Sequence, residues 1–315
     1  MGRRADCPQP ARRRYWGTMG QHYWGIDLGG TKIEGAVLAS ATSPSPLCRI
    51  RIPTEAQGGY QHVLARVCGL VERMQTQTGL KPERIGFGTP GVLDPQRSTL
   101  KNSSTLCYNG QPLKRDLERV LEVPAVLAND ANCFALAEAR LGAGAGAETV
   151  FGVILGTGVG GGVVIGGHVL DGAQGIAGEW GHNVVDASGP RCYCGRCGCV
   201  ETFLCGPALE RFYAGLGGTT RPLPEIVSRR AEDAAAEATV SRLLTYFGRS
   251  LAQVINVLDP HVVVLGGGVS NVEPLYTEGL REVARHVFND RLETRIVRHA
   301  LGDSAGVFGA AMLVT

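Results

Sequence analysis

The sequence lacks any long hydrophobic run. No apolar stretch in its 315 residues approaches the roughly 20 residues that a membrane-spanning helix needs. Residues 1–20 also lack the apolar core of a secretory signal. These absences argue against a membrane protein and against export, so we expect no membrane partner.

The chain also has little net charge, formally +2. Residues 1–20 hold five arginines and one aspartate, a net +4, which leaves −2 for the remainder. A slightly acidic body is not typical of a nucleic-acid-binding protein, so we expect no nucleic-acid partner. The leader itself is either a disordered extension, with Met19 as the natural start, or a basic arm for a nucleic acid or membrane surface.

Glycine, by contrast, is abundant. The chain has 45 glycines in 315 residues, about twice the usual share of about 7%. They cluster in 25–35, 156–167, 172–181 and 266–268, without a collagen-like period. Because glycine lets the backbone approach a ligand closely, these clusters predict ligand-holding loops.

Strand and helix patterns alternate along the chain, which predicts the α/β class. A unit of strand, glycine turn and strand occurs twice, at 23–38 and 150–165. The repeat predicts two similar α/β halves. Apolar segments predict further strands at 85–88, 125–127 and 261–265, and helical patterns cover 60–78, 131–141, 231–257 and 304–314.

The two glycine turns predict phosphate binding. In the first, successive backbone N–H groups and the Thr31 hydroxyl can hold a phosphate, Lys32 adds charge, and Asp27 can bind Mg²⁺ through water. The second turn runs from Gly156 to Gly162. It is not a Walker A loop, since no Gly-Lys-Ser/Thr follows, and it is a poor dinucleotide-binding fingerprint, since the next segment is a strand instead of a helix. Each alone could be an ordinary hairpin turn, but the pair is better explained as two clamps on one polyphosphate.

Two further polar or glycine-rich sites follow buried strands. Gly266–Gly268 can lie against a flat ligand such as adenine, or can simply turn the chain from strand to helix. Asp130 can accept a proton from a substrate hydroxyl while Asn129 orients a sugar. The alternative for Asp130 is a helix N-cap; beside two phosphate turns we favour the base.

The cysteines predict a metal site. Four of the ten cysteines fall between Cys192 and Cys199, ten residues after His182. Tetrahedral Zn²⁺ takes such ligands, and the best four are His182, Cys192, Cys194 and Cys199, which leaves Cys197 spare. An iron–sulfur cluster or disulfides fit the single histidine and tight spacing poorly. The scattered remaining cysteines favour free thiols in a reducing cytoplasm. A closed site of this kind is structural, and it leaves the second ring nitrogen of His182 for a substrate hydroxyl.

Taken together, the motifs resemble the ROK family (repressors, open reading frames, kinases) over residues 22–315. The motifs are Asp27–Lys32, Thr89-Pro90-Gly91, Asn129–Asn132, Gly156–Gly162, Gly178–His182, Cys192–Glu201 and Gly266–Gly268. The resemblance implies an actin-like, ribonuclease-H-like fold of two α/β lobes with an interlobe cleft. It also implies transfer of the γ-phosphoryl group of ATP to a hexose hydroxyl, with Mg²⁺ bridging the phosphates and a structural Zn²⁺.

The resemblance further implies a domain division. Residues 1–21 would be the disordered leader, and 22–125 with a C-terminal helix at about 303–315 would form the N-terminal lobe. Residues 126–302 would form the C-terminal lobe, which carries the zinc-binding loop. A homodimer is typical of the family and is expected here.

The same resemblance assigns residue roles. Asp130 would be the general base, and Asn102, Asn129, Glu179, His182 and Glu201 would bind the sugar. The ATP phosphates and adenosine would be held by Gly25, Asp27, Gly29, Gly30, Thr31, Lys32, Gly156, Thr157, Gly158, Gly160, Gly266, Gly267 and Gly268.

The subfamily pattern favours fructose. Lys101–Thr105, Asn109–Leu113 and Gly178–Asn183 look most like the bacterial fructokinases, including those that accept mannose, so fructose 6-phosphate is the expected product. Asn129–Leu136 is shared with N-acetylglucosamine kinases, and these and glucokinases are the alternatives. A sugar-responsive transcriptional regulator is a remote alternative, because a DNA-binding domain needs roughly 60 residues and only 24 precede Gly25.

Overall fold

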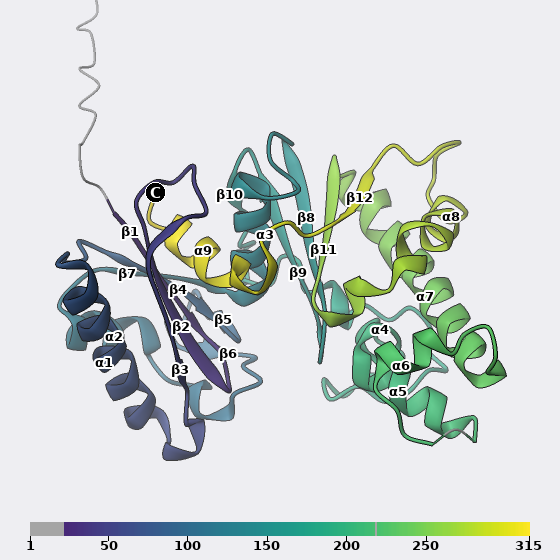
Figure 1. Cartoon of the computed structure of the whole chain (residues 1–315), viewed down its shortest axis with the longest axis horizontal. Coiled ribbons are helices and arrows are strands. Elements are labelled where there is room, and N and C mark those ends of the chain that lie inside the picture. The colour runs from purple at the N-terminus through teal and green to yellow at the C-terminus, as the bar shows by residue number, and fades with distance from the viewer. Residues whose placement is uncertain (1–21, 218) are drawn as a thin grey trace, which may run out of the picture.

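Two five-stranded sheets of the same topology form the molecule (Figure 1). The structure, a computed structural model, describes residues 22–217 and 219–315. The expected leader lies outside these residues. The strand orders are β3-β2-β1-β4-β7 and β10-β9-β8-β11-β12. In each sheet the first three strands along the chain pair antiparallel and the last two add in parallel. The expected α/β fold of two similar halves is confirmed.

The first sheet is buried on both faces. Helix α1 (Tyr60–Thr78) presents an apolar stripe at helical spacing, from Val63 to Met74, and ends at Gly79 in the left-handed conformation. It packs with α2 (Leu113–Leu121) over the outer face of the sheet (Figure 1). The strands are β1 (Tyr23–Leu28), β2 (Lys32–Leu38), β3 (Pro46–Pro53), β4 (Ile85–Thr89) and β7 (Ala125–Asn129), with a separate hairpin of β5 (Val92–Leu93) and β6 (Leu100–Lys101).

The second sheet is covered on one side by the long helix α7 (Ala234–Leu258). Asp233 caps this helix by accepting hydrogen bonds from the amides of Ala235 and Ala236. Its apolar face packs on the sheet with the helices around it. The strands are β8 (Thr149–Leu155), β9 (Val159–Ile165), β10 (His168–Val169), β11 (Val262–Gly266) and β12 (Arg295–Arg298); the other helices are α4 (Glu201–Leu204), α5 (Gly206–Gly215), α6 (Leu223–Ser228) and α8 (Glu278–Ala284).

Two helices join the sheets (Figure 1). Helix α3 (Asp130–Leu141) packs on β8 and β9, α9 (Ala305–Met312) packs on β1 and β4, and the two helices pack against each other. Small residues make this possible: a Cβ on Gly86 would lie 1.8 Å from the carbonyl oxygen of Ala310. The buried Glu138 on α3 accepts hydrogen bonds from Ala143, Ala300 and Leu301 amides at 2.8–3.1 Å. It therefore fixes α3 to the segment that returns the chain to α9.

The sheets place the lobe boundary slightly later than expected. We expected the first lobe to end at residue 125, but β7 continues to Asn129 and pairs along its length with β4. A division at 125/126 would cut a strand of the first sheet at its start. We therefore propose the boundary at Asn129/Asp130, where α3 begins, with α9 belonging to the first lobe.

Short 3-10 helices complete the chain, at Ala56–Gly58, Leu106–Tyr108, Trp180–His182, Gly268–Asn271, Glu273–Tyr276 and Gly302–Ser304. Among the helices of the described residues, none combines the length and the apolar character needed to cross a bilayer.

Candidate functional site

The first glycine turn joins β1 to β2, and hydrogen bonds from Thr54 hold it in place. Within the turn, the amide of Gly29 donates to the carbonyl of Lys32 at 2.9 Å. The buried Thr54 donates its hydroxyl to the carbonyl of Gly29 (2.7 Å) and its amide to the carbonyl of Thr31 (3.0 Å). Both carbonyls are thereby turned toward Thr54. The turn is held in one shape before any ligand arrives, which is what a backbone anion site requires.

Asp27 lies at the end of β1 under this turn. Burial, and then the charge of Asp130, raise the pKa of Asp27 to about 7, while Lys32 opposes the shift. On β2, Glu34 is opposite Asp27 and is almost fully buried. Arg51 binds Glu34 at 2.7 and 3.0 Å. Glu34 and the cations that pair with it, Lys32, Arg49 and Arg51, lie on β2 and β3, next to the strand that carries Asp27.

The second turn, between β8 and β9, has the same form. The amide of Gly156 donates to the carbonyl of Gly158 at 2.9 Å. The carboxylate of Glu201 accepts a hydrogen bond from the amide of Val159 at 3.0 Å. Thr157, at the tip, is exposed. The two predicted glycine turns thus occupy equivalent places in the two sheets, one between β1 and β2 and the other between β8 and β9.

A pocket of about 530 Å³ opens beside the second turn. Gly156, Thr157 and Gly268 line it together with apolar side chains from α6 and from the segment after β11. A pocket of mixed apolar wall and polar backbone is suited to a flat heterocycle such as adenine.

Four predicted ATP-site glycines lie outside the turns and serve packing. Gly25 lies against α9, where a Cβ would be 2.4 Å from the carbonyl of Val307. Gly160 lies on β9 with a Cβ position 3.1 Å from that of Ala131. Gly266 faces the ring of Phe134, and Gly267 adopts a positive φ of 81° against Leu155. The structure shows these glycines allowing close helix–sheet packing near the turns; Gly268 alone of its triplet lines the pocket.

Asp130 is the first residue of α3, beside the N-cap Asn129. The amide of Ala131 donates to the side chains of both Asn129 (2.9 Å) and Asp130 (2.8 Å), and Asn129 is the N-cap residue of the helix. The Asp130 carboxylate is open to solvent but is crowded by protein on its other sides. That crowding raises its pKa to about 6, with Glu179 adding to the shift. A carboxylate poised near neutral pH is suited to accept a proton.

The sugar-site candidates come from both lobes. Glu179 has a raised pKa because of burial; the charge of Glu201 raises it further, and His182 lowers it. The charge of Glu179 thus acts on Asp130, and the charges of His182 and Glu201 act on Glu179. Asn102, in the loop after β6, is exposed and left-handed with φ 58°.

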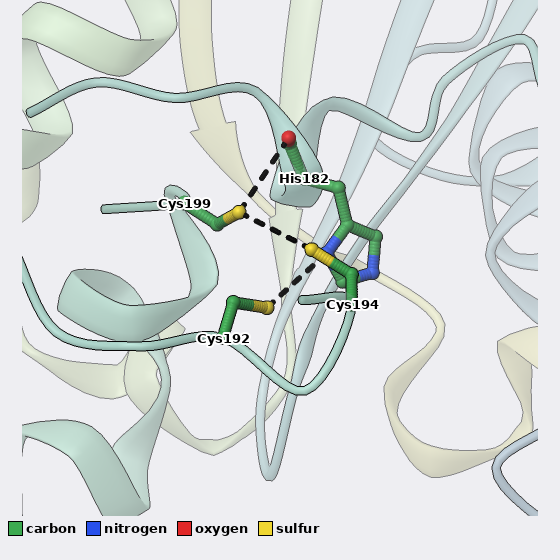
Figure 2. Close-up of side chains that lie close together, drawn as sticks. All are labelled: His182, Cys192, Cys194 and Cys199. Carbon is green, nitrogen blue, oxygen red and sulfur yellow. Dashed lines mark hydrogen bonds between the residues drawn. The ribbon is translucent and has the colours of Figure 1, made fainter. Parts of the chain in front are cut away.

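The four predicted zinc ligands converge (Figure 2). Their ligand atoms all lie within 4.8 Å of one another. Cys194 Sγ is 3.5 Å from Cys199 Sγ, and Cys192 Sγ is 3.6 Å from His182 Nδ1. Zn–S bonds of about 2.3 Å in a tetrahedron place sulfurs about 3.7 Å apart. A hydrogen bond from the backbone of Arg196 lowers the pKa of Cys194 to about 6, which favours the thiolate. The donor set therefore fits a closed zinc site, and Cys197 lies outside it, as predicted.

The second nitrogen of His182 already has a partner. Nε2 lies 3.0 Å from the hydroxyl of Tyr193, and the two rings meet edge to face at 5.1 Å. The sequence interpretation had left this nitrogen free for a substrate hydroxyl, so Tyr193 is an addition that the pattern did not reveal.

The sequence did not predict the roles of two other residues, which hold the first glycine turn and the Asn102 loop in place. Thr54 follows β3 and is separated from the turn it holds by more than twenty residues. Asn109 supports the Asn102 loop by exchanging hydrogen bonds of 2.9 Å with the backbone of Ser103. The sequence around Thr54 and around Asn109 does not indicate these hydrogen bonds, because each forms only when the chain folds.

Comparison with known proteins identifies the family. The model of the ROK family matches residues 23–315. The chain is 35% identical to an N-acetyl-D-glucosamine kinase of Yersinia pseudotuberculosis and 36% identical to one of Photobacterium profundum, each alignment covering 92% of this chain and 98% of the relative. It is also similar to a solved ROK hexokinase from Thermus thermophilus, with 37% identity, a TM-score of 0.82, and coverage of 93% and 97%. A ROK glucokinase from Streptomyces griseus, solved with glucose and AMPPNP, is 30% identical with a TM-score of 0.76, covering 93% of this chain and 99% of that one.

The chain therefore belongs to the ROK family. Within that family it is a sugar kinase, since relatives with a third or more of their residues in common with it are sugar kinases along almost their whole length.

Proposed function

We propose that this sugar kinase transfers the γ-phosphoryl group of ATP to a hydroxyl of N-acetyl-D-glucosamine. The support for the sugar is the name shared by the curated relatives that match at 35–36% identity over 92% of the chain. The sequence had favoured fructose, and the comparisons give fructose no support. N-acetyl-D-glucosamine, which was the stated alternative, takes its place.

Asp130 carries the chemistry in this proposal. The sugar hydroxyl lies against its carboxylate, which removes the proton as the oxygen attacks the γ-phosphorus; the bond from that phosphorus to the β,γ-bridging oxygen breaks, and ADP leaves with the electron pair. The pKa of about 6 leaves the group ionised at neutral pH yet basic enough to take a proton. Asn129 keeps its amide NH₂ for the sugar, because its carbonyl oxygen is used by the helix cap.

The two glycine turns position ATP. Gly30 and Thr31 in one lobe, and Thr157 and Gly158 in the other, present backbone N–H groups to the phosphates, and the adenine occupies the pocket at Gly268. Lys32 supplies positive charge, and Asp27 would hold Mg²⁺ through its water shell. Mg²⁺ neutralises charge on the phosphates when bound. Phosphoryl transfer depends mainly on such positioning and charge neutralisation.

The zinc site shapes the sugar pocket and performs no chemistry. His182, Cys192, Cys194 and Cys199 would hold the ion, which would fix the loop from Glu179 to Glu201. Glu179 and Glu201 then bind hydroxyl groups of the sugar. A closed site with four protein ligands leaves no open position for a reacting water.

The observation that supports the proposal is that the charge of Glu179 acts on Asp130, while Glu201, whose charge acts on Glu179, also holds the second glycine turn through the amide of Val159. A coupled ADP-release assay with ATP, Mg²⁺ and N-acetyl-D-glucosamine tests it. We expect ADP release that depends on the sugar. Absence of sugar-dependent ADP with this sugar and with the common hexoses would contradict the proposal.

The expected homodimer is retained as part of the proposal. Exposed apolar side chains at Leu170, Ile176 and Val257 border a groove of about 330 Å³ near Trp180, and they offer a surface that association could cover. Analytical ultracentrifugation at micromolar concentration tests this expectation.

A further inference from the structure

Tyr193 is highly exposed, yet it makes a specific contact with His182. It lies between two zinc-ligand cysteines and is 79% exposed. An aromatic ring with so little burial has few packing constraints to hold it in place. Yet its hydroxyl lies 3.0 Å from His182 Nε2, and its ring meets the imidazole at an interplanar angle of 87°.

The His182 ring has one nitrogen outside the zinc-ligand cluster that could bind a sugar. Nδ1 lies among the cysteine sulfurs, 3.6 Å from Cys192 Sγ (Figure 2). Only Nε2 remains to hydrogen-bond a sugar. With Nδ1 on zinc, Nε2 carries a single N–H and donates a single strong hydrogen bond. Tyr193 and a sugar hydroxyl are therefore alternative acceptors at the same atom.

We propose that Tyr193 is a gate on the sugar site: its hydroxyl occupies the place of a sugar hydroxyl on His182 and must swing away when the sugar binds. This inference rests on the proposed function, because it takes His182 as a sugar contact. The high exposure of Tyr193 allows the movement, since the ring leaves little buried surface behind.

The gate has a consequence for sugar affinity. While the site is empty, the hydroxyl of Tyr193 keeps His182 Nε2 hydrogen-bonded. A sugar with a well-placed hydroxyl regains this bond after displacing Tyr193. A sugar that lacks the hydroxyl displaces Tyr193 without regaining the bond and leaves a polar group unpaired. Tyr193 thus weakens binding of every sugar that displaces it, by about the value of one hydrogen bond.

The test is Tyr193→Phe, which keeps the ring and removes only the hydroxyl. The dissociation constant for N-acetyl-D-glucosamine is measured by calorimetry in the absence of ATP. Removing a competing hydrogen bond should tighten binding about two- to tenfold. The KM for the sugar should fall in parallel, and the KM for ATP should stay the same.

Cys197→Ser is the matched control, because Cys197 is exposed on the same loop and lies outside the ligand set. Its sugar affinity should equal that of the wild type, and all three proteins should carry equal zinc. A dissociation constant unchanged in Tyr193→Phe would overturn the gate, and a weaker one would make Tyr193 a sugar ligand instead. If the wild type neither binds the sugar nor releases ADP with it, the proposed function fails; if it does both and Tyr193→Phe behaves identically, only the gate fails.

Discussion

Glu201 accepts a hydrogen bond from the backbone amide of Val159 at 3.0 Å, and so ties the zinc loop to the second phosphate turn. The contact is tight, since a Cβ on Gly158 would lie 2.8 Å from the same carboxylate oxygen. The residue proposed to bind the sugar thus also shapes the turn proposed to bind ATP. Both ligands depend on one side chain.

Glu201→Ala should therefore raise the KM values for sugar and ATP together, each by about tenfold, which corresponds to the loss of one or two hydrogen bonds. Glu201→Gln keeps an oxygen that can accept from Val159. We expect it to restore the KM for ATP while the KM for the sugar stays raised. Steady-state kinetics with each substrate varied in turn measures both values. An unchanged KM for ATP in Glu201→Ala would show that the tie has no functional role.

Asp130→Asn should reduce kcat by a factor of about 10² to 10⁴, the usual contribution of a general base. The sugar should still bind, because asparagine keeps the shape and a hydrogen-bonding oxygen. Calorimetry measures binding and the coupled assay measures turnover. Turnover within a few-fold of the wild type would refute the role of base.

The pH dependence follows from the same residue. The pKa of Asp130 is raised to about 6, and the base acts only when ionised. For the wild type, kcat should therefore rise with pH, reach half of its plateau near pH 6, and stay level above it. An acid limb centred near pH 4, the ordinary range of an exposed aspartate, would contradict the shifted pKa.

Thr54→Val should raise the KM for ATP by about five- to tenfold, because valine has the shape of threonine but cannot donate to the carbonyl of Gly29. The KM for the sugar should change little, since Thr54 lies behind the phosphate turn. Thr54→Ser restores the hydroxyl and should restore the KM for ATP. If serine and valine behave alike, the hydroxyl does not position the turn.

Metal analysis should find one Zn²⁺ per chain. Cys199→Ser, which removes a buried ligand, should lower zinc content and weaken sugar binding much more than ATP binding. Cys197→Ser on the same loop should retain both. Zinc-free protein with full sugar affinity would exclude a structural role for the metal.

Local pattern was sufficient to predict much of the fold. The buried strands 23–28 and 150–155, with a glycine turn after each, were predicted because the turn chemistry and the apolar run lie side by side in the chain. Helix 60–78 was predicted in full, since its apolar stripe has clear helical spacing. Short elements were not predicted, such as β10 with two residues and α4 with four.

The sequence predicted those candidate site residues whose motif can be recognised from neighbouring residues alone. The four zinc ligands, Asp130 and the two turns are visible because spacing alone suggests them. Thr54, Glu138 and Tyr193 were not found, because a threonine, a helical glutamate and an exposed tyrosine have no distinctive pattern. Their roles come from partners brought together by folding. The choice of sugar also lay beyond the motifs: segments such as Gly178–Asn183 favoured fructose, while the similar curated relatives are N-acetyl-D-glucosamine kinases.

The central claim is tested most directly by competition between sugars. The protein is given ATP, Mg²⁺ and an equimolar mixture of N-acetyl-D-glucosamine, fructose, glucose and mannose, and the phosphorylated products are quantified by mass spectrometry, with Asp130→Asn as the control. The ratio of products reports the ratio of kcat/KM values. We predict that N-acetylhexosamine phosphate dominates and that Asp130→Asn forms almost none of it. A product dominated by hexose phosphate would contradict the assignment.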